Sequence, residues 1–412
     1  MKRKVSGLIF ITVVIVAVFS LTTAFANDLT PNEMLGKKLF FDKISSPDSM
    51  SCASCHDPKV GFTGSVGGIN KHGAVYRGAV PQRFGNRKPP SAAYATLSPV
   101  FYYDTDEELF VGGNFWDGRA TGERLGNPAA DQALGPFLNP VEQNNPSKQA
   151  VCEQVEKSKY AGLFEEVWGP GSLDCSSAGI EGMYDRIGLS IAAYEGSSEV
   201  NQFSSKYDAF LAGAVELSDE ETLGLALFEG KAMCSACHPT TIASPLTDFT
   251  YDNLGTPRNP ENPFYDMDEV YLDDGSPINP LGEVWVDAGL GGFLQSRPEW
   301  SAMVLENMGK QKVPTLRNVD KREDVDSPKA YSHNGYFKSL KGIVHFYNTR
   351  DIKPKCPDPF TTEKKALKMG CWPAPEIAYN VNSDELGDLG LTDAEEDAVV
   401  SFLKTLSDGF QP

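Results

Sequence analysis

The sequence predicts a mainly α-helical protein of two similar domains, with long loops and few short strands. Three observations lead to this fold class. The chain has 412 residues, which is more than one hydrophobic core usually organises. The pattern Cys-x-x-Cys-His occurs twice, at residues 52–56 and 234–238. Each copy follows an apolar stretch that carries the start signal of a helix, so the same unit is used twice.

The Cys-x-x-Cys-His pattern is the attachment motif of a c-type haem. Its two thiols add to the vinyl groups of one porphyrin, and the adjacent histidine becomes the proximal ligand of the iron. A redox dithiol or half of a zinc site is the alternative for one isolated copy, but two copies in an exported chain favour haem. We therefore expect two cytochrome c-like haem domains. Their attachment residues are Cys52, Cys55 and His56 in the first, and Cys234, Cys237 and His238 in the second.

The first 26 residues have the pattern of a secretory signal peptide. Basic residues at 2–4 precede an apolar run over 5–21, and residues 24–26 offer a small-x-small cleavage site near Ala26. A membrane anchor is the alternative interpretation of this run. No other stretch is apolar for long enough to span a bilayer. We expect a periplasmic or otherwise exported protein with domains at 27–205 and 206–412.

Capping boxes mark the expected beginnings of three helices, at residues 30–33, 218–221 and 392–395. The first two helices precede the two attachment motifs. The third is the terminal helix, and its apolar stripe predicts packing on the second haem domain. Between these helices, residues 61–90 are expected to form a long loop and residues 244–294 an extended insertion over the second haem.

Net charge limits the class of partner. The chain carries −19, and removal of the three basic residues of the leader takes this to −22. Such acidity disfavours nucleic acid and anionic membrane, and it suits a basic electron donor.

Four cysteines lie outside the haem motifs. In an oxidising compartment disulfides are expected. Local pairing of Cys152 with Cys175 and of Cys356 with Cys371 is the simplest of three connectivities, and free buried thiols are the alternative.

Several further blocks appear in a fixed order along the chain. Phe-Trp-Asp-Gly-Arg stands at 115–119, Gln132 and Glu142 follow, and Pro-Thr-Leu-Arg-Asn stands at 314–318. With the two haem motifs, these blocks resemble the bacterial di-haem cytochrome c peroxidase family, which includes MauG-like enzymes. The resemblance covers nearly all of the mature chain.

The resemblance implies roles for individual residues. Trp116 would relay electrons between the haems, although a core tryptophan is the alternative. Gln132 and Glu142 would lie over the open iron of the first haem. A carboxyl group there can take a proton from peroxide and return it to the departing oxygen. A solvated surface acid is the alternative for Glu142. His333 is expected near the second haem in a hydrogen-bonding role.

The distal ligand of the second haem departs from the typical peroxidases. Those enzymes have methionine fourteen residues after the family histidine, and this chain has Tyr347, as MauG-like enzymes do. Phenolate stabilises ferric and higher iron, whereas thioether favours ferrous iron. His345 is a competing ligand.

Two further sites follow from the resemblance alone. His72 could cap the first haem and leave on activation, and a plain surface histidine is the alternative. The family also holds calcium between its domains. Asn86 is the nearest candidate ligand, but Lys88 occupies what looks like the aligned position.

The expected function is reduction of hydrogen peroxide to water, with electrons passed through the second haem from a small cytochrome c or cupredoxin. The alternative is a MauG-like oxidase that uses peroxide to oxidise aromatic residues of a partner protein. A di-haem electron carrier is a third interpretation, against which Gln132 and Glu142 argue. A homodimer stays open as an assembly.

Overall fold

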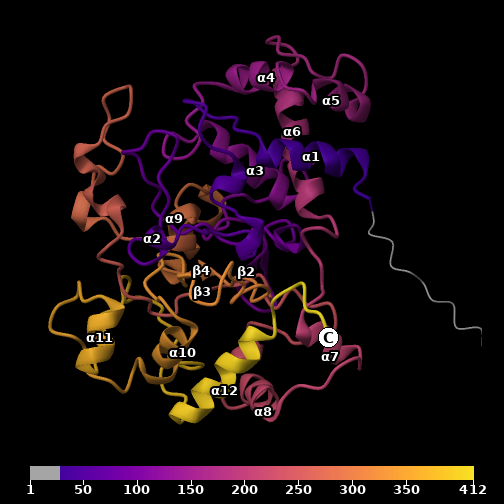
Figure 1. Ribbon diagram of the computed structural model, residues 1–412. Helices are drawn as coiled ribbons and strands as arrows, with labels where there is room; N and C mark the ends of the chain where they lie inside the picture. The colour runs from indigo at the N-terminus through magenta and orange to yellow at the C-terminus, as the bar shows by residue number, and fades with distance from the viewer. Residues whose placement is uncertain (1–27) are drawn as a thin grey trace, which may run out of the picture.

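The computed structural model describes residues 28–412, and it confirms a mainly α-helical chain with few short strands. The predicted signal peptide lies outside the described residues. In the described part of the chain, no helix has the length and apolar character to cross a membrane. Figure 1 shows most helices of the N-terminal half at the top, most helices of the C-terminal half at the bottom and the short strands between them.

The helices of residues 28–412 fall into two groups of six. Those of the N-terminal half are α1 (Pro31–Phe41), α2 (Gly67–Asn70), α3 (Pro128–Leu138), α4 (Lys148–Glu156), α5 (Ala161–Trp168) and α6 (Ile180–Glu195). Those of the C-terminal half are α7 (Lys206–Leu211), α8 (Asp219–Glu229), α9 (Gly289–Leu294), α10 (Leu340–Thr349), α11 (Glu363–Met369) and α12 (Asp393–Lys404).

The strands form two antiparallel pairs. β1 (Tyr102–Asp104) pairs with β2 (Leu109–Val111), so that Tyr103 lies opposite Phe110. β3 (Tyr251–Asp252) pairs with β4 (Gln311–Lys312), so that Tyr251 lies opposite Lys312. The second pair joins residues sixty positions apart and closes the long insertion between them.

The first helix of each half crosses the last helix of the same half. α1 packs on α6, and α8 packs on α12. A glycine stands at each crossing: a Cβ at Gly36 would lie 1.8 Å from the Ser190 oxygen, and one at Gly224 would lie 1.9 Å from the Ala398 oxygen. Only glycine allows backbones to approach this closely. The two halves therefore share one plan.

All three predicted capping boxes are present, at the starts of α1, α8 and α12. The two local disulfides are also confirmed: Cys152 bonds to Cys175, and Cys356 bonds to Cys371. The other four cysteines of the described chain, those of the two attachment motifs, are free thiols.

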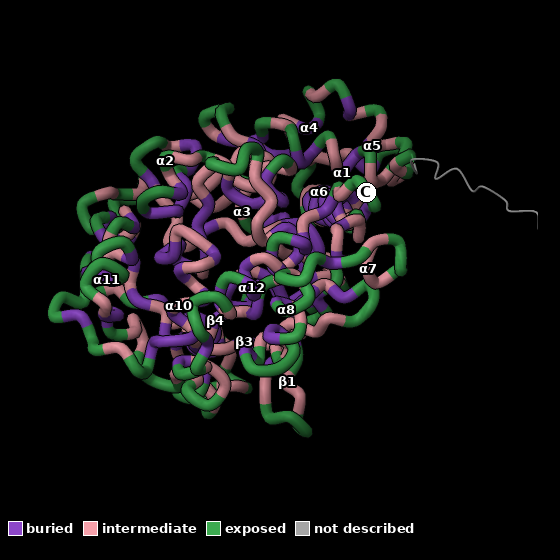
Figure 2. Tube along the Cα trace, turned by 60° about the horizontal axis from the view of Figure 1, so that its bottom comes forward, coloured by how far each residue is buried: buried purple, intermediate pink, exposed green. Residues whose placement is uncertain are grey.

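Each half has its own hydrophobic core, and a third cluster joins the halves. The third cluster combines Phe101 and Phe110 with Tyr251, Leu290 and Leu294. Figure 2 shows the buried segments running through the middle of the molecule beneath exposed loops. The halves are thus in contact through apolar packing as well as through the connecting chain.

The chain passes from one half to the other near residue 205. Phe203 packs on Tyr94 of the N-terminal half, with ring centroids 4.9 Å apart. Tyr207 packs on Phe402 of the C-terminal half at 5.2 Å. The insertion over 244–294 also reaches both halves, because Asn259 donates to the carbonyls of Gly73 and Asn334.

Candidate active site

One continuous cavity contains both attachment motifs. Cys52, Cys55 and His56 line one part of it, and the equivalent residues of the second motif line the other. Both halves of the chain contribute to its wall. The first cysteine of each motif opens a short 3-10 helix, at Cys52–Ser54 and Cys234–Ala236.

Each motif histidine is oriented by a backbone carbonyl. Nδ1 of His56 lies 3.1 Å from the Phe62 oxygen, and Nδ1 of His238 lies 2.7 Å from the Leu246 oxygen. A carbonyl can only accept, so Nδ1 carries the proton and Nε2 is left to ligate a metal. Burial lowers the pKa of both histidines, which favours this neutral form.

The two acceptor residues share an uncommon backbone conformation. Phe62 has φ +56° and Leu246 has φ +55°, in the left-handed region that bulky residues rarely adopt. The same strained turn therefore presents the carbonyl at both sites. With the thiols, the free Nε2 atoms and the cavity, these residues fit two c-type haems.

Gln132 and Glu142 both line the cavity that contains His56. Gln132 lies on α3, and Glu142 lies in the turn that follows this helix. The Glu142 carbonyl accepts from the Ala79 N–H at 2.7 Å, and its own N–H donates to Asn139 at 3.0 Å. A Cβ at Gly78 would lie 2.5 Å from the Val141 oxygen, so the neighbouring loop fixes this turn closely.

Burial raises the pKa of the Glu142 carboxyl, and Arg119 and Asn139 partly oppose the rise. Arg119 in turn lies over the Phe115 ring, 3.9 Å from its centroid, and pairs with Asp117 at 2.7 Å. Arg119 also lines the cavity. Arg119 is therefore a polar residue of the site. The 115–119 block did not by itself indicate this role.

Trp116 lies where the two halves meet. Its indole Nε1 donates to the Lys88 carbonyl at 2.8 Å, and its own carbonyl accepts from the Lys312 N–H at 2.7 Å. The His333 ring packs on the indole edge to face, with centroids 6.3 Å apart. Burial lowers the pKa of His333 to about 4, so it is neutral at physiological pH. The structure thus places His333 beside Trp116.

On α10, Tyr347 and His345 face different surroundings. Tyr347 lines the cavity with Cys234, Cys237 and His238. His345 is outside the cavity wall, and its Nδ1 lies 2.8 Å from Oε1 of Glu396 on α12. The Tyr347 phenol therefore faces the second attachment motif, and the His345 imidazole takes part in the contact between α10 and α12.

His72 is at the surface. Its side chain is 68% exposed, and Nδ1 lies 2.9 Å from Oε1 of Glu261 in the insertion. It does not line the cavity that contains His56. This placement corresponds to the surface-histidine alternative.

The surroundings of Asn86 fit a calcium ion poorly. The Asn86 carbonyl is engaged by the Asn262 amide at 3.0 Å. The Lys88 ammonium is buried nearby in sequence and donates to the Thr63 hydroxyl at 3.0 Å and to the Pro89 carbonyl at 3.2 Å. Among residues 28–412, no three His, Cys, Asp or Glu side chains gather as a metal cluster.

Comparison with known proteins gives concordant matches. The family model described as di-haem cytochrome c peroxidase matches residues 30–216. The methylamine utilization protein MauG of Paracoccus denitrificans is 33% identical over 388 residues, which cover 91% of this chain and 88% of that protein. The cytochrome-c peroxidase IdrP2 of a Pseudomonas species is 26% identical over 90% of this chain and 80% of its own.

A solved structure extends the match to three dimensions. The diheme peroxidase BthA from Burkholderia thailandensis superposes with a TM-score of 0.72 at 30% identity. The superposition covers 93% of this chain and 87% of that one.

Proposed function

Because this chain belongs to the family of di-haem cytochrome c peroxidases and MauG proteins, we propose that it is an exported di-haem peroxidase. It reduces hydrogen peroxide to water with electrons from a small redox protein, a cytochrome c or a cupredoxin. The observation that carries this proposal is the presence of Gln132 and Glu142 in one cavity with His56. An electron carrier has no use for an acid at this place.

The chain's own residues divide the work. Bound haem supplies an iron that accepts peroxide and exchanges single electrons. Glu142 would take a proton from one oxygen of peroxide and return it to the departing oxygen. The Gln132 amide would orient the peroxide by hydrogen bonding. Trp116, held by Lys88 and Lys312 where the two halves meet, would carry electrons between the two haem sites.

Replacement of Glu142 by Gln tests the proposal. The amide keeps the size of the side chain and cannot take a proton, so kcat/KM for peroxide should fall about 10²- to 10⁴-fold. Steady-state turnover with a reduced donor gives this number. Glu107→Gln, an exposed change in the β1–β2 turn, is the matched control. Full activity of Glu142→Gln, with the haem spectra of the wild type, would contradict the role.

The raised pKa of Glu142 also predicts a pH dependence. The carboxylate is the active base, so the peroxide reaction should slow as pH falls through this pKa, which lies above the ordinary value for glutamate. The acid limb of the pH–rate profile should disappear in Glu142→Gln. An unchanged limb in the variant would assign it to another group.

Tyr347 favours a second function, a MauG-like oxidation of aromatic residues in a partner protein. A hard anionic ligand lets the second haem share oxidising equivalents with the first. The test is to add peroxide to the diferric protein and follow near-infrared absorption. A long-lived oxidised state supports the oxidase, and rapid return to the ferric spectrum supports the peroxidase.

A further inference from the structure

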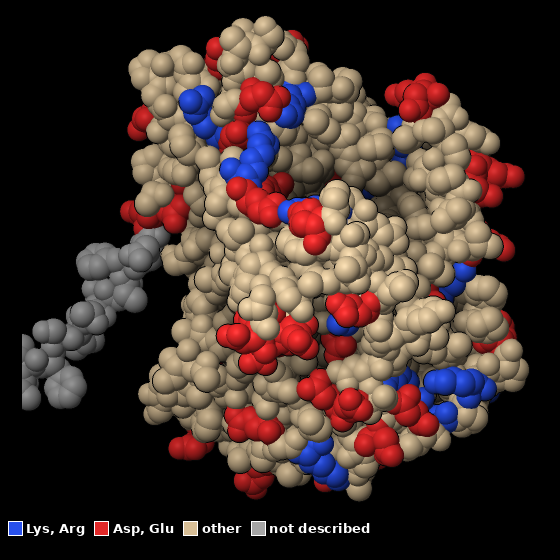
Figure 3. Space-filling view, turned by 180° about the vertical axis from the view of Figure 1, so that it is seen from behind, with Lys and Arg blue, Asp and Glu red and all other residues tan. Residues whose placement is uncertain are grey.

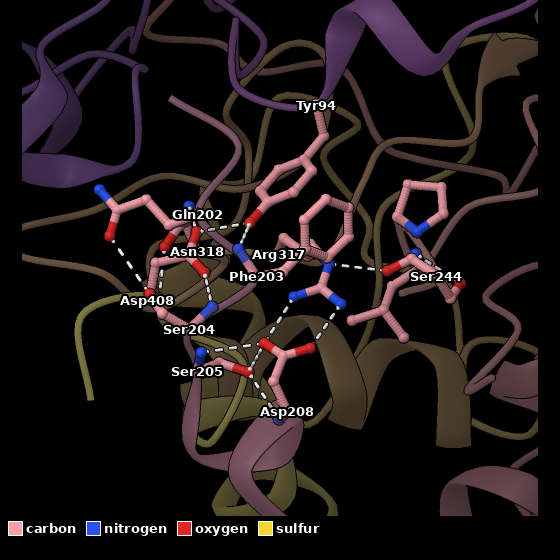
Figure 4. A network of polar contacts seen from close by, with 12 residues as sticks. Tyr94, Gln202, Phe203, Ser204, Ser205, Asp208, Ser244, Arg317, Asn318 and Asp408 are labelled. Carbon is pink, nitrogen blue, oxygen red and sulfur yellow. Dashed lines mark hydrogen bonds and ion pairs between the residues drawn. The ribbon is translucent and has the colours of Figure 1, made fainter. Parts of the chain in front are cut away.

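Tyr94 lies in the wall of the haem cavity with its hydroxyl against a buried carboxylate. We propose that Tyr94 and Asp408 form a proton-coupled redox site, at which the protein holds one oxidising equivalent away from the haems. The inference rests on the proposed function, since the oxidant is the haem pair after its reaction with peroxide. Figure 4 shows the residues involved.

The Tyr94 hydroxyl is held by two hydrogen bonds, one that it donates and one that it accepts. Tyr94 is 1% exposed and lines the cavity together with His56. Its OH donates to Oδ2 of Asp408 at 2.8 Å, and the OH oxygen accepts from the Phe203 N–H at 3.0 Å. Asp408 is itself buried. The phenol proton therefore has a carboxylate acceptor within one hydrogen bond and no bulk water beside it.

The other hydrogen bonds to the Asp408 carboxylate come from a side-chain amide and a backbone N–H. Oδ2 also accepts from the Asn318 amide at 2.8 Å, and Oδ1 accepts from the Ser204 N–H at 3.1 Å. These donors are uncharged. The nearby guanidinium of Arg317 is instead paired bidentately with Asp208, at 2.9 Å for both contacts. The guanidinium is thus bonded to Asp208, and Oδ2 of Asp408 faces the phenol O–H.

The backbone is strained where these side chains meet. Tyr94, Phe203 and Asn318 all have positive φ, at +64°, +46° and +61°. Such conformations cost free energy and persist where surrounding structure enforces them. The Arg317 guanidinium lies 4.4 Å from the Phe203 ring centroid and 5.1 Å from that of Tyr94, and so clamps both rings. The fold holds this hydroxyl in place at a cost.

Other tyrosines of the cavity provide the comparison. Four tyrosines line it in the described chain, and two of them, Tyr94 and Tyr331, donate to a carboxylate. Tyr331 makes the longer contact, 3.2 Å, to Oδ1 of Asp320. That oxygen also accepts two bonds from the Arg322 guanidinium, at 2.9 and 3.0 Å. The Asp320 oxygen is thus already engaged by a guanidinium, whereas the Asp408 carboxylate accepts from an amide and a backbone N–H, so the geometry favours Tyr94.

The chemistry balances without another reactant. One electron leaves the Tyr94 phenol for the oxidised haem pair, which is reduced by one equivalent. The O–H bond of Tyr94 breaks, and the proton forms an O–H bond with Oδ2 of Asp408. Burial and the Asp408 charge raise the pKa of Tyr94, so the phenol stays protonated until it is oxidised. The products are a neutral tyrosyl radical and a neutral carboxylic acid.

The experiment uses the full di-haem protein with ring-deuterated tyrosine. Peroxide is added without a donor, samples are frozen within milliseconds, and the free-radical EPR signal is compared with that of unlabelled protein. We expect a signal that narrows on deuteration, disappears in Tyr94→Phe and persists in Tyr331→Phe. Its rate of formation should fall several-fold in D2O. A signal lost in Tyr331→Phe, or unaffected by tyrosine labelling, would overturn the inference.

Asp408→Asn provides a second variant, in which the ring and its hydroxyl are retained. The amide cannot take the phenol proton, so the radical yield should fall at least tenfold. An unchanged yield would show that Asp408 is not the acceptor. Optical spectra of the same samples separate the two proposals. If peroxide does not alter the ferric haem bands, the proposed function fails; if it does so without a tyrosine signal, this inference alone fails.

Discussion

Two side chains on α10 are the candidate distal ligands of the second haem. Tyr347 and His345 are two residues apart, so on a helix they point to different faces. The structure places the phenol in the cavity and the imidazole against Glu396. Sequence counting had already favoured Tyr347, but only the fold shows what engages His345.

Tyr347→Met should raise the reduction potential of the second haem, since thioether favours ferrous iron and phenolate favours ferric iron. Axial ligands tune haem potentials over a range of about 0.8 V, and we expect a rise on the order of 0.1 V. Potentiometric titration of the two haems measures it. His345→Gln is the control on the same helix and should leave the potential and the axial-ligand bands unchanged. A changed potential in His345→Gln, with no change in Tyr347→Met, would instead make His345 the ligand.

The buried Lys88 leads to a prediction about calcium that a chelator can test. The Lys88 amine is buried and donates to Thr63 and Pro89, so a donor of the chain already occupies this place. Dialysis against EDTA should leave peroxide turnover and haem spectra of the wild type unchanged. Lys88→Gln should lower the free energy of unfolding by about 1–3 kcal/mol, because the Thr63 hydroxyl loses the buried donor that Lys88 provides. Loss of activity with EDTA and recovery with calcium would contradict this expectation.

At the scale of elements, the crossings α1 on α6 and α8 on α12 depend on Gly36 and Gly224. Changing either to Ala puts a methyl group into a facing carbonyl, which should lower the free energy of unfolding by about 1–3 kcal/mol or more. Denaturant unfolding followed by far-UV circular dichroism measures the loss. Gly162→Ala is the matched control, because a Cβ at that helical position meets nothing within 4 Å. Equal behaviour of all three variants would exclude close packing as the reason for these glycines.

The sequence identified α1, α8 and α12 but not α6. The first three have capping boxes, whereas α6 begins after Gly179, which has no side chain to cap it. Its role as the partner of α1 became visible only through its packing. The third core is similar: Phe101 and Tyr251 are far apart in the chain, and no local periodicity connects them. Local sequence patterns predicted the capped helices and the attachment motifs. They could not predict contacts between residues that are far apart in the chain.

The surface of the whole molecule is acidic. Figure 3 shows Asp and Glu in many separate groups on one face, with Lys and Arg in fewer groups. The net charge of −19 should steer a basic donor toward the protein. We expect the second-order rate with a basic cytochrome c to fall about tenfold between low and physiological ionic strength. Stopped-flow kinetics measures it, and an acidic cupredoxin is the control that should show no such fall.

The shared wall of the cavity has a consequence for biogenesis. The turn that presents the Phe62 carbonyl to His56 is held from the other half: Lys329 donates to the Val60 carbonyl at 3.1 Å, and a Cβ at Gly61 would meet Asn318 at 2.6 Å. The turn beside His56 is therefore complete only after residues 318–329 of the other half have folded against it. The N-terminal half alone lacks both contacts, so the first pocket is a product of the whole chain and not of one half.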